Sequence, residues 1–355
     1  MAKELWKGNE AIAEAAIRAG CRCYFGYPIT PQSEIPEYMS LHMPKVGGIF
    51  LQSESEVAAI NMVYGASGAG ARVMTSSSSP GISLKQEGIS YICSAELPAV
   101  IVNVMRGGPG LGTIQPSQGD YFQATRGGGH GDYRVIVFAP ANIQEVVDLM
   151  QDSFELADKY RMPVMMIMDG MIGQMMEPVE WKKPPVNPED LPAKPWATTG
   201  TKGIHEPKAI HSLFIDPNES NDHNMRLDAK YQRIMADEQR YETSETEDAE
   251  LIFVAFGTPA RLARAAARLL EEEGIKAGVF RPITIWPYPY DALYQAAAQD
   301  SVKAVVTVEM NTGQMIDDVR IAVRGCKPVS FVGQAGGRVP TPQEVVAAAK
   351  SALGR

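Results

Sequence analysis

Residues 51–66, LQSESEVAAINMVYGA, are the stretch around which the chain is organised. Their pattern predicts the end of a strand, a short turn and a helix. The helix is apolar on nearly every side, through Val57, Ala58, Ala59, Ile60, Met62, Val63 and Ala66. A helix that is apolar all round is normally buried. It nevertheless opens with a carboxylate, Glu56, so this side chain is either a helix cap or a functional group.

The capping interpretation of Glu56 rests on its spacing from Ser53. In a capping box, a serine at the N-cap position is followed three residues later by a glutamate that reaches back to the N-cap backbone N–H. The helix dipole also favours acidic residues in a first helical turn. This stretch alone favours the cap, and the rest of the chain must decide between the two interpretations.

Composition limits the classes of function. The 355 residues, 45% of them apolar, are enough for about two domains with sizeable cores. The net charge is −9 and there is no long basic run, so we expect no nucleic-acid partner. No apolar run reaches the ~18 residues of a membrane span, and the first residues, MAKELWKGNEAIAEAA, do not resemble a signal peptide. We therefore expect a cytoplasmic protein that does not interact with membranes.

Cysteine and methionine have different expected roles. The four cysteines form no C-x-x-C motif and no Cys/His cluster at metal-binding spacing. They are expected to be free, buried thiols, and this chain should carry no metal or iron–sulfur centre of its own. Methionine is clustered, and either packs a core or interface or lines a substrate pocket. The cluster comprises Met165, Met166, Met168, Met171, Met175 and Met176.

The alternation of strand and helix patterns predicts an α/β fold. We expect strands at 22–26, 49–52, 73–76, 99–105, 135–138 and 164–168, with helices between them. This order indicates a parallel sheet covered by helices on both faces. We expect a first domain at 1–177, a linker and polar, exposed helix at 178–249, and a smaller α/β domain at 250–355. Within these last two segments the polar helix is expected at 222–241 and loops at 244–250 and 281–288.

Several unusual loops should meet at one edge of the first sheet. The motifs YPITP at 27–31, SSSSPG at 76–81 and RGGPG at 106–110 each follow an expected strand, as does the Glu56 turn. In parallel sheets the ligand crevice lies beyond the carboxyl ends of the strands. The glycines of GASGAG at 65–70 lie at the far end of a helix, so they favour close helix packing over dinucleotide binding. His130 either faces the crevice or is a solvated loop residue.

Three motifs, in their order and spacing, resemble a known family. They are GYPITPQSEIPEY, QSESEVAAINMVYGASGAGARVMTSSSSPGISL and VNVMRGGPG, followed in the second unit by FRPITIWPYP and VEMNTGQM. The chain resembles the alpha subunit of 2-oxoacid:ferredoxin oxidoreductases, in particular the short subunits of the 2-oxoisovalerate and 2-oxoglutarate types. The resemblance implies a parallel-sheet, pyrimidine-binding domain for thiamine diphosphate, followed by a domain like the carboxy-terminal domain of transketolase.

The resemblance also implies a role for Glu56, which matches the family's cofactor glutamate, whereas Glu54 lacks that context. A buried glutamate hydrogen-bonded to the cofactor's pyrimidine ring promotes the imino tautomer, which removes the proton from the thiazolium C2 atom. The cofactor then performs the decarboxylation, and the protein positions and polarises it. With the resemblance, the functional interpretation of Glu56 outweighs the cap, although one side chain can serve both roles.

Further site residues follow from the same motifs. Thr30 matches a threonine near the substrate, and Arg106 matches an arginine that can make a forked contact to the carboxylate of a 2-oxo acid. Their alternatives are a turn shaped by prolines, with Thr30 incidental, and a surface salt bridge of Arg106. The residues expected near the cofactor are Glu56, Pro28, Ile29, Ser78 and Gly81.

A motif that is missing from this sequence predicts that the chain works with partner subunits. Thiamine diphosphate enzymes hold the diphosphate through magnesium with a G-D-G motif and a later asparagine, and this chain has no G-D-G. The resemblance therefore implies half an active site. A beta subunit should bring the diphosphate and Mg²⁺ site and the iron–sulfur clusters, with gamma and ferredoxin-like delta subunits completing the assembly. CoA, ferredoxin and a 2-oxo acid would be the reactants.

The expected activity is oxidative decarboxylation of a 2-oxo acid, with 2-oxoisovalerate favoured, to an acyl-CoA and CO2. Electrons would pass to ferredoxin, and the chain alone would be inactive. One alternative is a subunit of a non-redox thiamine diphosphate enzyme of transketolase or decarboxylase type. The other is a non-catalytic α/β assembly subunit, against which the joint presence of Glu56, Thr30 and Arg106 argues.

Overall fold

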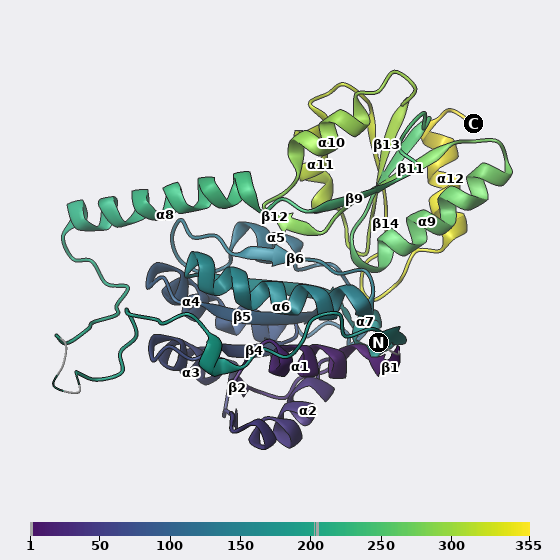
Figure 1. Cartoon of the computed structure of the whole chain (residues 1–355). Coiled ribbons are helices and arrows are strands. Elements are labelled where there is room, and N and C mark those ends of the chain that lie inside the picture. Colours follow the sequence, from purple (N-terminus) through teal and green to yellow (C-terminus); the bar gives the residue numbers. More distant parts are fainter. Residues whose placement is uncertain (1–2, 202, 204–205) are drawn as a thin grey trace.

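The computed structural model describes residues 3–201, 203 and 206–355, and its first unit is built on a seven-stranded sheet (Figure 1). The strand order is β12-β6-β7-β5-β4-β2-β3. Every pairing is parallel except that of β12 with β6. The strands are β2 (Cys23–Gly26), β3 (Ile49–Gln52), β4 (Val73–Ser77), β5 (Ala99–Met105), β6 (Ile136–Phe138), β7 (Pro163–Asp169) and β12 (Thr284–Trp286).

Helices cover both faces of this sheet, as predicted. All seven residues of β5 and of β7 are buried, which requires cover on both sides. Helix α1 packs against α6, and α3 packs against α4. The helices of this unit are α1 (Gly8–Arg18), α2 (Glu34–His42), α3 (Glu56–Gly68), α4 (Pro80–Ser94), α5 (Tyr121–Arg126), α6 (Ile143–Tyr160) and α7 (Gly170–Gln174), with short 3₁₀ turns at Pro44–Val46 and Pro188–Asp190.

The second unit has its own five-stranded sheet, of order β14-β13-β10-β11-β9, in which only β9 is antiparallel to its neighbour. Its strands are β9 (Tyr241–Ser244), β10 (Leu251–Val254), β11 (Ala277–Pro282), β13 (Ala304–Glu309) and β14 (Val329–Gly333). Its helices are α9 (Gly257–Glu272), α10 (Tyr290–Ala297), α11 (Met315–Val323) and α12 (Pro342–Ala352). A mixed α/β architecture is therefore confirmed.

Two expectations about the connections were wrong, and one further pairing was not predicted. The segment 281–288 is not a simple loop, because β11 extends to Pro282 and β12 then adds an antiparallel edge to the first sheet. Residues 241–244 form β9 and do not continue the preceding helix. The chain's start also pairs with a distant segment, since β1 (Glu4–Lys7) lies antiparallel to β8 (Met176–Val179). Each of these is a long-range pairing that the local pattern does not reveal.

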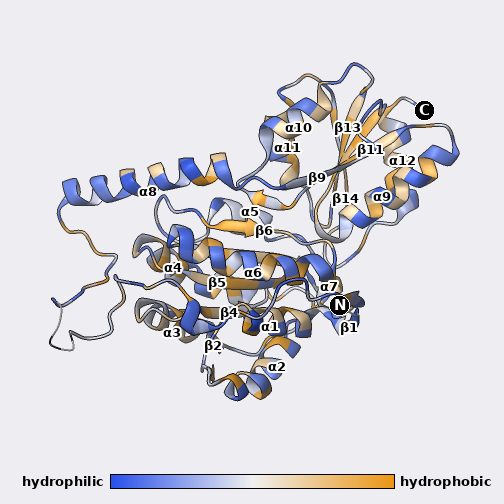
Figure 2. Ribbon diagram, viewed as in Figure 1, coloured by the Kyte–Doolittle hydropathy of each residue, from blue (hydrophilic) through white to orange (hydrophobic). Residues whose placement is uncertain are grey.

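The polar helix α8 (Pro217–Asp237) begins and ends earlier than expected, because Asp216 caps it and Pro217 occupies its first turn. It runs along one side of the molecule and is largely hydrophilic (Figures 1 and 2). It is not exposed all round, because one face is buried, through His223, Leu227, Lys230, Tyr231 and Ile234. The ammonium of Lys230 donates to Glu96 at 3.0 Å, which ties this face to the first unit.

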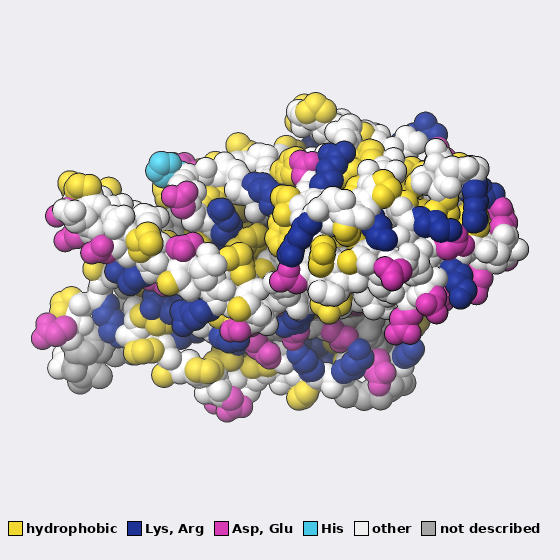
Figure 3. Space-filling model, turned by 90° about the horizontal axis from the view of Figure 1, so that it is seen from above, with side chains coloured by type: hydrophobic (Ala, Val, Ile, Leu, Met, Phe, Trp, Pro, Cys, Tyr) yellow, Lys and Arg dark blue, Asp and Glu magenta, His cyan; other side chains and the backbone are white. Residues whose placement is uncertain are grey.

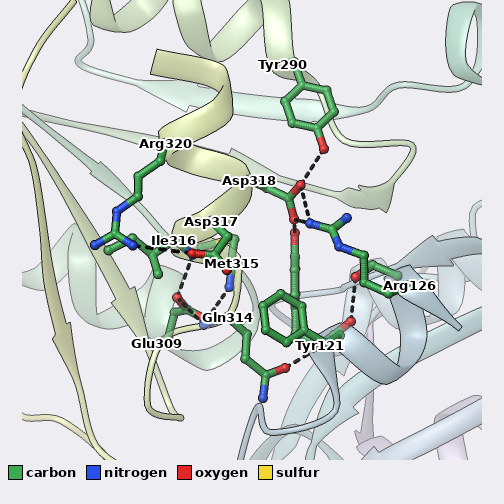
Figure 4. Close-up of polar contacts among 12 residues, drawn as sticks. Tyr121, Arg126, Tyr290, Glu309, Gln314, Met315, Ile316, Asp317, Asp318 and Arg320 are labelled. Atoms are coloured by element: carbon green, nitrogen blue, oxygen red, sulfur yellow. Dashed lines mark hydrogen bonds and ion pairs between the residues drawn. The ribbon is translucent and has the colours of Figure 1, made fainter. Parts of the chain in front are cut away.

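A polar cluster around Asp318 joins the two units (Figure 4). The Asp318 carboxylate, on α11, accepts hydrogen bonds from the Tyr121 hydroxyl at 2.7 Å, from the Arg126 guanidinium at 2.9 Å, and from the Tyr290 hydroxyl. Tyr121 and Arg126 belong to α5, in the first unit. Because a buried carboxylate needs such partners, the contacts fix α5 and the loop before it against the second unit.

On the face seen in Figure 3, Lys and Arg side chains are interspersed with Asp and Glu, so this face presents no continuous basic patch. No helix among the described residues combines the length and apolarity that crossing a bilayer requires.

Candidate functional site

Four neighbouring strands deliver the predicted loops to one edge of the first sheet. The strands β5, β4, β2 and β3 are adjacent and parallel, so their carboxyl ends lie side by side. The loops that follow them contain Arg106, the serine run, Thr30 and Glu56 respectively. The sequence expectation that these motifs converge on one edge is therefore confirmed.

Glu56 is the first residue of α3, and only 6% of it is exposed. The predicted capping box is wrong. The N-cap residue is Ser55, whose hydroxyl accepts from the Ala58 N–H at 3.1 Å. The Ser53 hydroxyl instead donates to the carbonyls of Gly26 and Ser55. A buried carboxylate that does not serve as a cap is available for another contact.

The α3 helix is also less buried than its composition suggests. Its buried face consists of Glu56, Ala59, Ile60, Val63, Ser67 and Gly68. The opposite face is open, with Val57 45% exposed. The other exposed residues of this face, Asn61 and Gly65, are not large and apolar, so the predicted burial on all sides is wrong.

Gly81 allows α4 to approach Glu56 closely. A Cβ atom at this position would lie 2.1 Å from the Ser77 hydroxyl oxygen and 2.7 Å from Oε1 of Glu56. Only glycine fits between these two groups. One turn further along the same helix face, Lys85 is completely buried.

The serine run contributes further polar groups. The hydroxyl oxygens of Ser77 and Ser78 are buried without a hydrogen-bond partner among the described residues. Ser79 has φ of 25° and ψ of −82°, a conformation that favours glycine and stores strain in other residues. Unpartnered buried hydroxyls next to a strained loop are typical of a place where a ligand supplies the missing contacts.

Asp120 holds the strained loop in place and was missed by the sequence analysis. Its carboxylate accepts from the Ser79 hydroxyl at 2.5 Å and from the Asn103 amide at 2.8 Å. The Asn103 oxygen in turn accepts from the Ser79 N–H. Burial raises the pKa of Asp120, while its hydrogen bonds and the charge of Arg106 act in the opposite direction.

The Arg106 side chain contacts the backbone of Thr30 and not the Thr30 hydroxyl. The Arg106 guanidinium donates to the carbonyl of Thr30 at 3.0 Å and to that of Leu111 at 3.1 Å. Its Nε atom is buried without a hydrogen-bond partner among the described residues, and none of their carboxylates forms an ion pair with it. The alternative of a surface salt bridge is therefore wrong. Arg106 connects two loops and retains one unused donor.

The other predicted residues are divided between surface and interior. Pro28 and Thr30 are exposed, Ile29 is half-buried, and Ser78 and Gly81 are buried. A cavity of about 540 Å³ lies beside Thr30 and is lined in part by Pro31, Ile114 and Met171, but not by Glu56. Met165, Met166 and Met168 are core residues. His130 is exposed and lines a different cavity, so it belongs to another part of the surface.

The donor set fits one end of a thiamine diphosphate molecule. Glu56, the unpartnered serine hydroxyls and the close approach at Gly81 suit a flat, polar heterocycle that needs a carboxylate and hydrogen-bonding oxygens. Among the described residues, no group of three His, Cys, Asp or Glu side chains is placed to hold a metal ion. The residues present therefore match the pyrimidine end of the cofactor.

Comparisons with known proteins identify the family. Residues 14–246 match the family model "Pyruvate flavodoxin/ferredoxin oxidoreductase, thiamine diP-bdg", and residues 249–345 match "Pyruvate:ferredoxin oxidoreductase core domain II". The chain is 49% identical to ketoisovalerate oxidoreductase subunit VorB of Methanothermobacter thermautotrophicus over 98% of this chain and 97% of that one. It is 38% identical to 2-oxoglutarate synthase subunit KorA of Methanocaldococcus jannaschii, over 97% and 98% respectively.

Solved structures give the same result. The 2-oxoglutarate:ferredoxin oxidoreductase of Magnetococcus marinus, solved with 2-oxoglutarate, coenzyme A and succinyl-CoA bound, superposes with a TM-score of 0.83 at 27% identity. That match covers 99% of this chain and 65% of the other. A split-gene transketolase matches with a TM-score of 0.61 at 18% identity, over 98% of each chain, and shows a shared fold alone. The chain therefore belongs to the 2-oxoacid:ferredoxin oxidoreductase family, as an alpha-type subunit with a thiamine diphosphate-binding domain.

Proposed function

We propose that the chain supplies the pyrimidine-binding half of the active site of an enzyme that converts 2-oxoisovalerate and CoA to an acyl-CoA and CO2. Electrons pass to ferredoxin. The observation that carries this proposal is the position of Glu56, a buried carboxylate that does not cap its helix and that faces Gly81 and the serine run. When bound, thiamine diphosphate supplies the carbon nucleophile and the electron sink for decarboxylation.

In this proposal, the chain's own residues bind and orient the pyrimidine ring of the cofactor. Glu56 would hold the pyrimidine ring through a proton shared with a ring nitrogen, which would make the ring's exocyclic amino group a better base. The hydroxyls of Ser77 and Ser78 are unpartnered and could add hydrogen bonds, and Gly81 lets α4 approach Glu56 closely. Because Glu56 is buried, a proton that it shared would be held away from bulk water, and the interaction would be stronger than in water.

Arg106 and Thr30 orient the substrate. The free Nε donor of Arg106 lies next to the two guanidinium nitrogens that hold Thr30 and Leu111, so a carboxylate arriving at the site finds an unused donor and a full positive charge. The cavity beside Thr30, with Ile114 and Met171 in its wall, offers apolar surface for a branched side chain. These features support a substrate with one carboxylate and an apolar end.

A partner subunit completes the site on the exposed side. Large apolar residues are exposed around the carboxyl edge of the sheet, namely Tyr27, Leu51, Val57, Leu84 and Leu111. Such a group marks a protein contact surface. The occupant we propose is the beta subunit, which carries the G-D-G motif, the Mg²⁺ ion and the iron–sulfur clusters. Gamma and ferredoxin-like delta subunits then extend the electron path to ferredoxin.

The substrate assignment is tested with the assembled enzyme. The relatives named for ketoisovalerate are 49% identical, against 38% or less for those named for 2-oxoglutarate, which supports 2-oxoisovalerate. We expect CoA-dependent reduction of ferredoxin with a kcat/KM at least tenfold higher for 2-oxoisovalerate than for 2-oxoglutarate, since a second carboxylate must be desolvated in an apolar cavity. A preference for 2-oxoglutarate would contradict the assignment, and turnover without CoA or ferredoxin would favour a non-redox thiamine enzyme.

A further inference from the structure

Lys85 occupies a position where the fold alone gives no reason for a lysine. Gly81, Lys85 and Gly88 are spaced at i, i+4 and i+7 on α4, so they share one helix face. Both glycines on this face touch α3: a Cβ atom at Gly81 would lie 2.7 Å from Oε1 of Glu56, and one at Gly88 would lie 2.5 Å from Ile60. Lys85 therefore lies on the face of α4 that packs against the start of α3.

The ammonium of Lys85 is buried without an ion pair. Its side chain has no exposed surface, and its Nζ atom donates to the Thr75 hydroxyl at 2.6 Å and to the Ser76 carbonyl at 3.0 Å. No carboxylate of the described residues lies within 4.0 Å of it. Burying an ammonium with two neutral acceptors costs stability. A methionine of similar length would fill the same space more favourably.

The charge that acts on Lys85 is that of Glu56. Burial lowers the pKa of Lys85 to about 7, and the Glu56 charge acts in the opposite direction. No other charged group among the described residues acts appreciably on Lys85. Strand β4 presents Thr75 and Ser76, strand β5 has no titratable side chain, and Tyr24 on β2, which bonds to Ser76, stays neutral because burial raises its pKa. Asp169, at the end of β7, accepts hydrogen bonds from backbone N–H groups at Met171 and Thr258.

We propose that Lys85 is a positioning residue that acts through Glu56, and that its positive charge keeps the proton shared with the pyrimidine ring on the ring side. A cation close to a carboxylate favours the ionised carboxylate, and so the transfer of a shared proton to the ring. The proposal rests on the proposed function, because it assigns Lys85 a task only if Glu56 contacts the cofactor.

The test compares Lys85→Met with the matched control Lys230→Met. Lys230 is also a buried lysine whose pKa burial lowers, but its partner is Glu96. Glu96 follows the end of α4, whereas the contact with Glu56 is made at Gly81, near the start of that helix. In the assembled enzyme with thiamine diphosphate, Lys85→Met should slow exchange of the C2 proton about tenfold at pH 6, where Lys85 is largely protonated. The acid limb of its pH profile should move to higher pH, because a neighbouring cation favours the ionised form of a carboxylate. Lys230→Met should leave the profile unchanged.

Stability gives a second readout that needs no cofactor. The folded-state pKa of Lys85, about 7, lies below its ordinary value of 10.5, so the unfolded chain binds more protons between these two pH values. The destabilisation is complete below pH 7 and shrinks as the pH rises toward 10.5. The Tm of Lys85→Met should therefore exceed that of the wild-type chain at pH 6, with a smaller difference at pH 9. A lower Tm at both pH values would mean that Lys85 is a packing residue and would overturn the proposal.

A third variant separates charge from hydrogen bonding. Lys85→Gln keeps a donor for Thr75 but carries no charge, so it should show the same shifted acid limb as Lys85→Met. A wild-type profile in either variant would overturn the proposal. If instead the wild-type enzyme itself shows no accelerated C2 exchange, the proposed function fails, and this outcome is distinguishable from a failure that concerns Lys85 alone.

Discussion

Glu56→Gln should slow exchange of the thiamine C2 proton in the assembled enzyme by a factor of about 10² to 10⁴, the range typical of a positioned acid–base group. The amide keeps the size of the side chain but cannot hold the shared proton on the ring. The exchange rate is measured by NMR after transfer into deuterated buffer. The free energy of unfolding should change little, because Ser55 and not Glu56 caps the helix.

Glu54 provides the matched control for this substitution. It is a glutamate two residues earlier in the same turn, but its side chain is exposed. Glu54→Gln should leave C2 exchange and Tm as in the wild-type enzyme. If Glu56→Gln exchanges normally and only loses the ~0.5–2 kcal/mol typical of a helix cap, Glu56 is a structural residue and the mechanism proposed here is wrong.

Arg106→Ala should lower kcat/KM about ten- to a hundredfold, which corresponds to the ~1.5–3 kcal/mol of a charge-assisted hydrogen bond. The loss should be similar for branched and linear 2-oxo acids, because all of them carry the carboxylate next to the ketone. Arg106→Lys should recover only part of the activity, since a lysine cannot make a forked contact. Steady-state kinetics with several 2-oxo acids measures both effects.

Arg106 also holds the carbonyls of Thr30 and Leu111, so its removal loosens two loops as well as removing a charge. The experiment therefore needs a control for the loss of loop order. Arg126→Ala removes another arginine from the same connection, but one whose guanidinium pairs with Asp318 in the second unit. It should lower Tm while leaving the relative kcat/KM values of the substrates unchanged. If Arg106→Ala lowers activity for 2-oxoglutarate alone, Arg106 binds the distal carboxylate and our assignment is wrong.

The parts of the fold predicted well are those with a strong local pattern. The long helix at Ile143–Tyr160 and the buried strand at Ala99–Met105 are both bounded by turn-forming residues and have an unambiguous apolar period. The strand β12 was missed because three residues inside a Pro-rich segment carry no such period. It forms only because β6 offers an open edge far away in the sequence.

The site residues follow a similar rule. Glu56, Thr30 and Arg106 stand in recognisable motifs, so their neighbourhood at one sheet edge was predictable from parallel topology. The identity of the helix cap could not be predicted, because Ser53 and Ser55 both precede the helix. Only the backbone conformation shows that Ser55 is the N-cap residue. Lys85 had a usable signal, since it lies four residues after Gly81, but its burial depends on how closely α4 packs against α3. Asp120 reaches Ser79 from a distant loop, a contact that no local pattern encodes.

The central claim, that this chain holds only the pyrimidine half of a shared site, is tested most directly by calorimetry with thiamine diphosphate and Mg²⁺. The titration is made into the purified chain alone and into the chain assembled with its beta subunit. We predict no tight binding to the chain alone, because it has no G-D-G motif for the metal and diphosphate, and micromolar or tighter binding to the assembly. Micromolar, Mg²⁺-dependent binding to the chain alone would contradict the account.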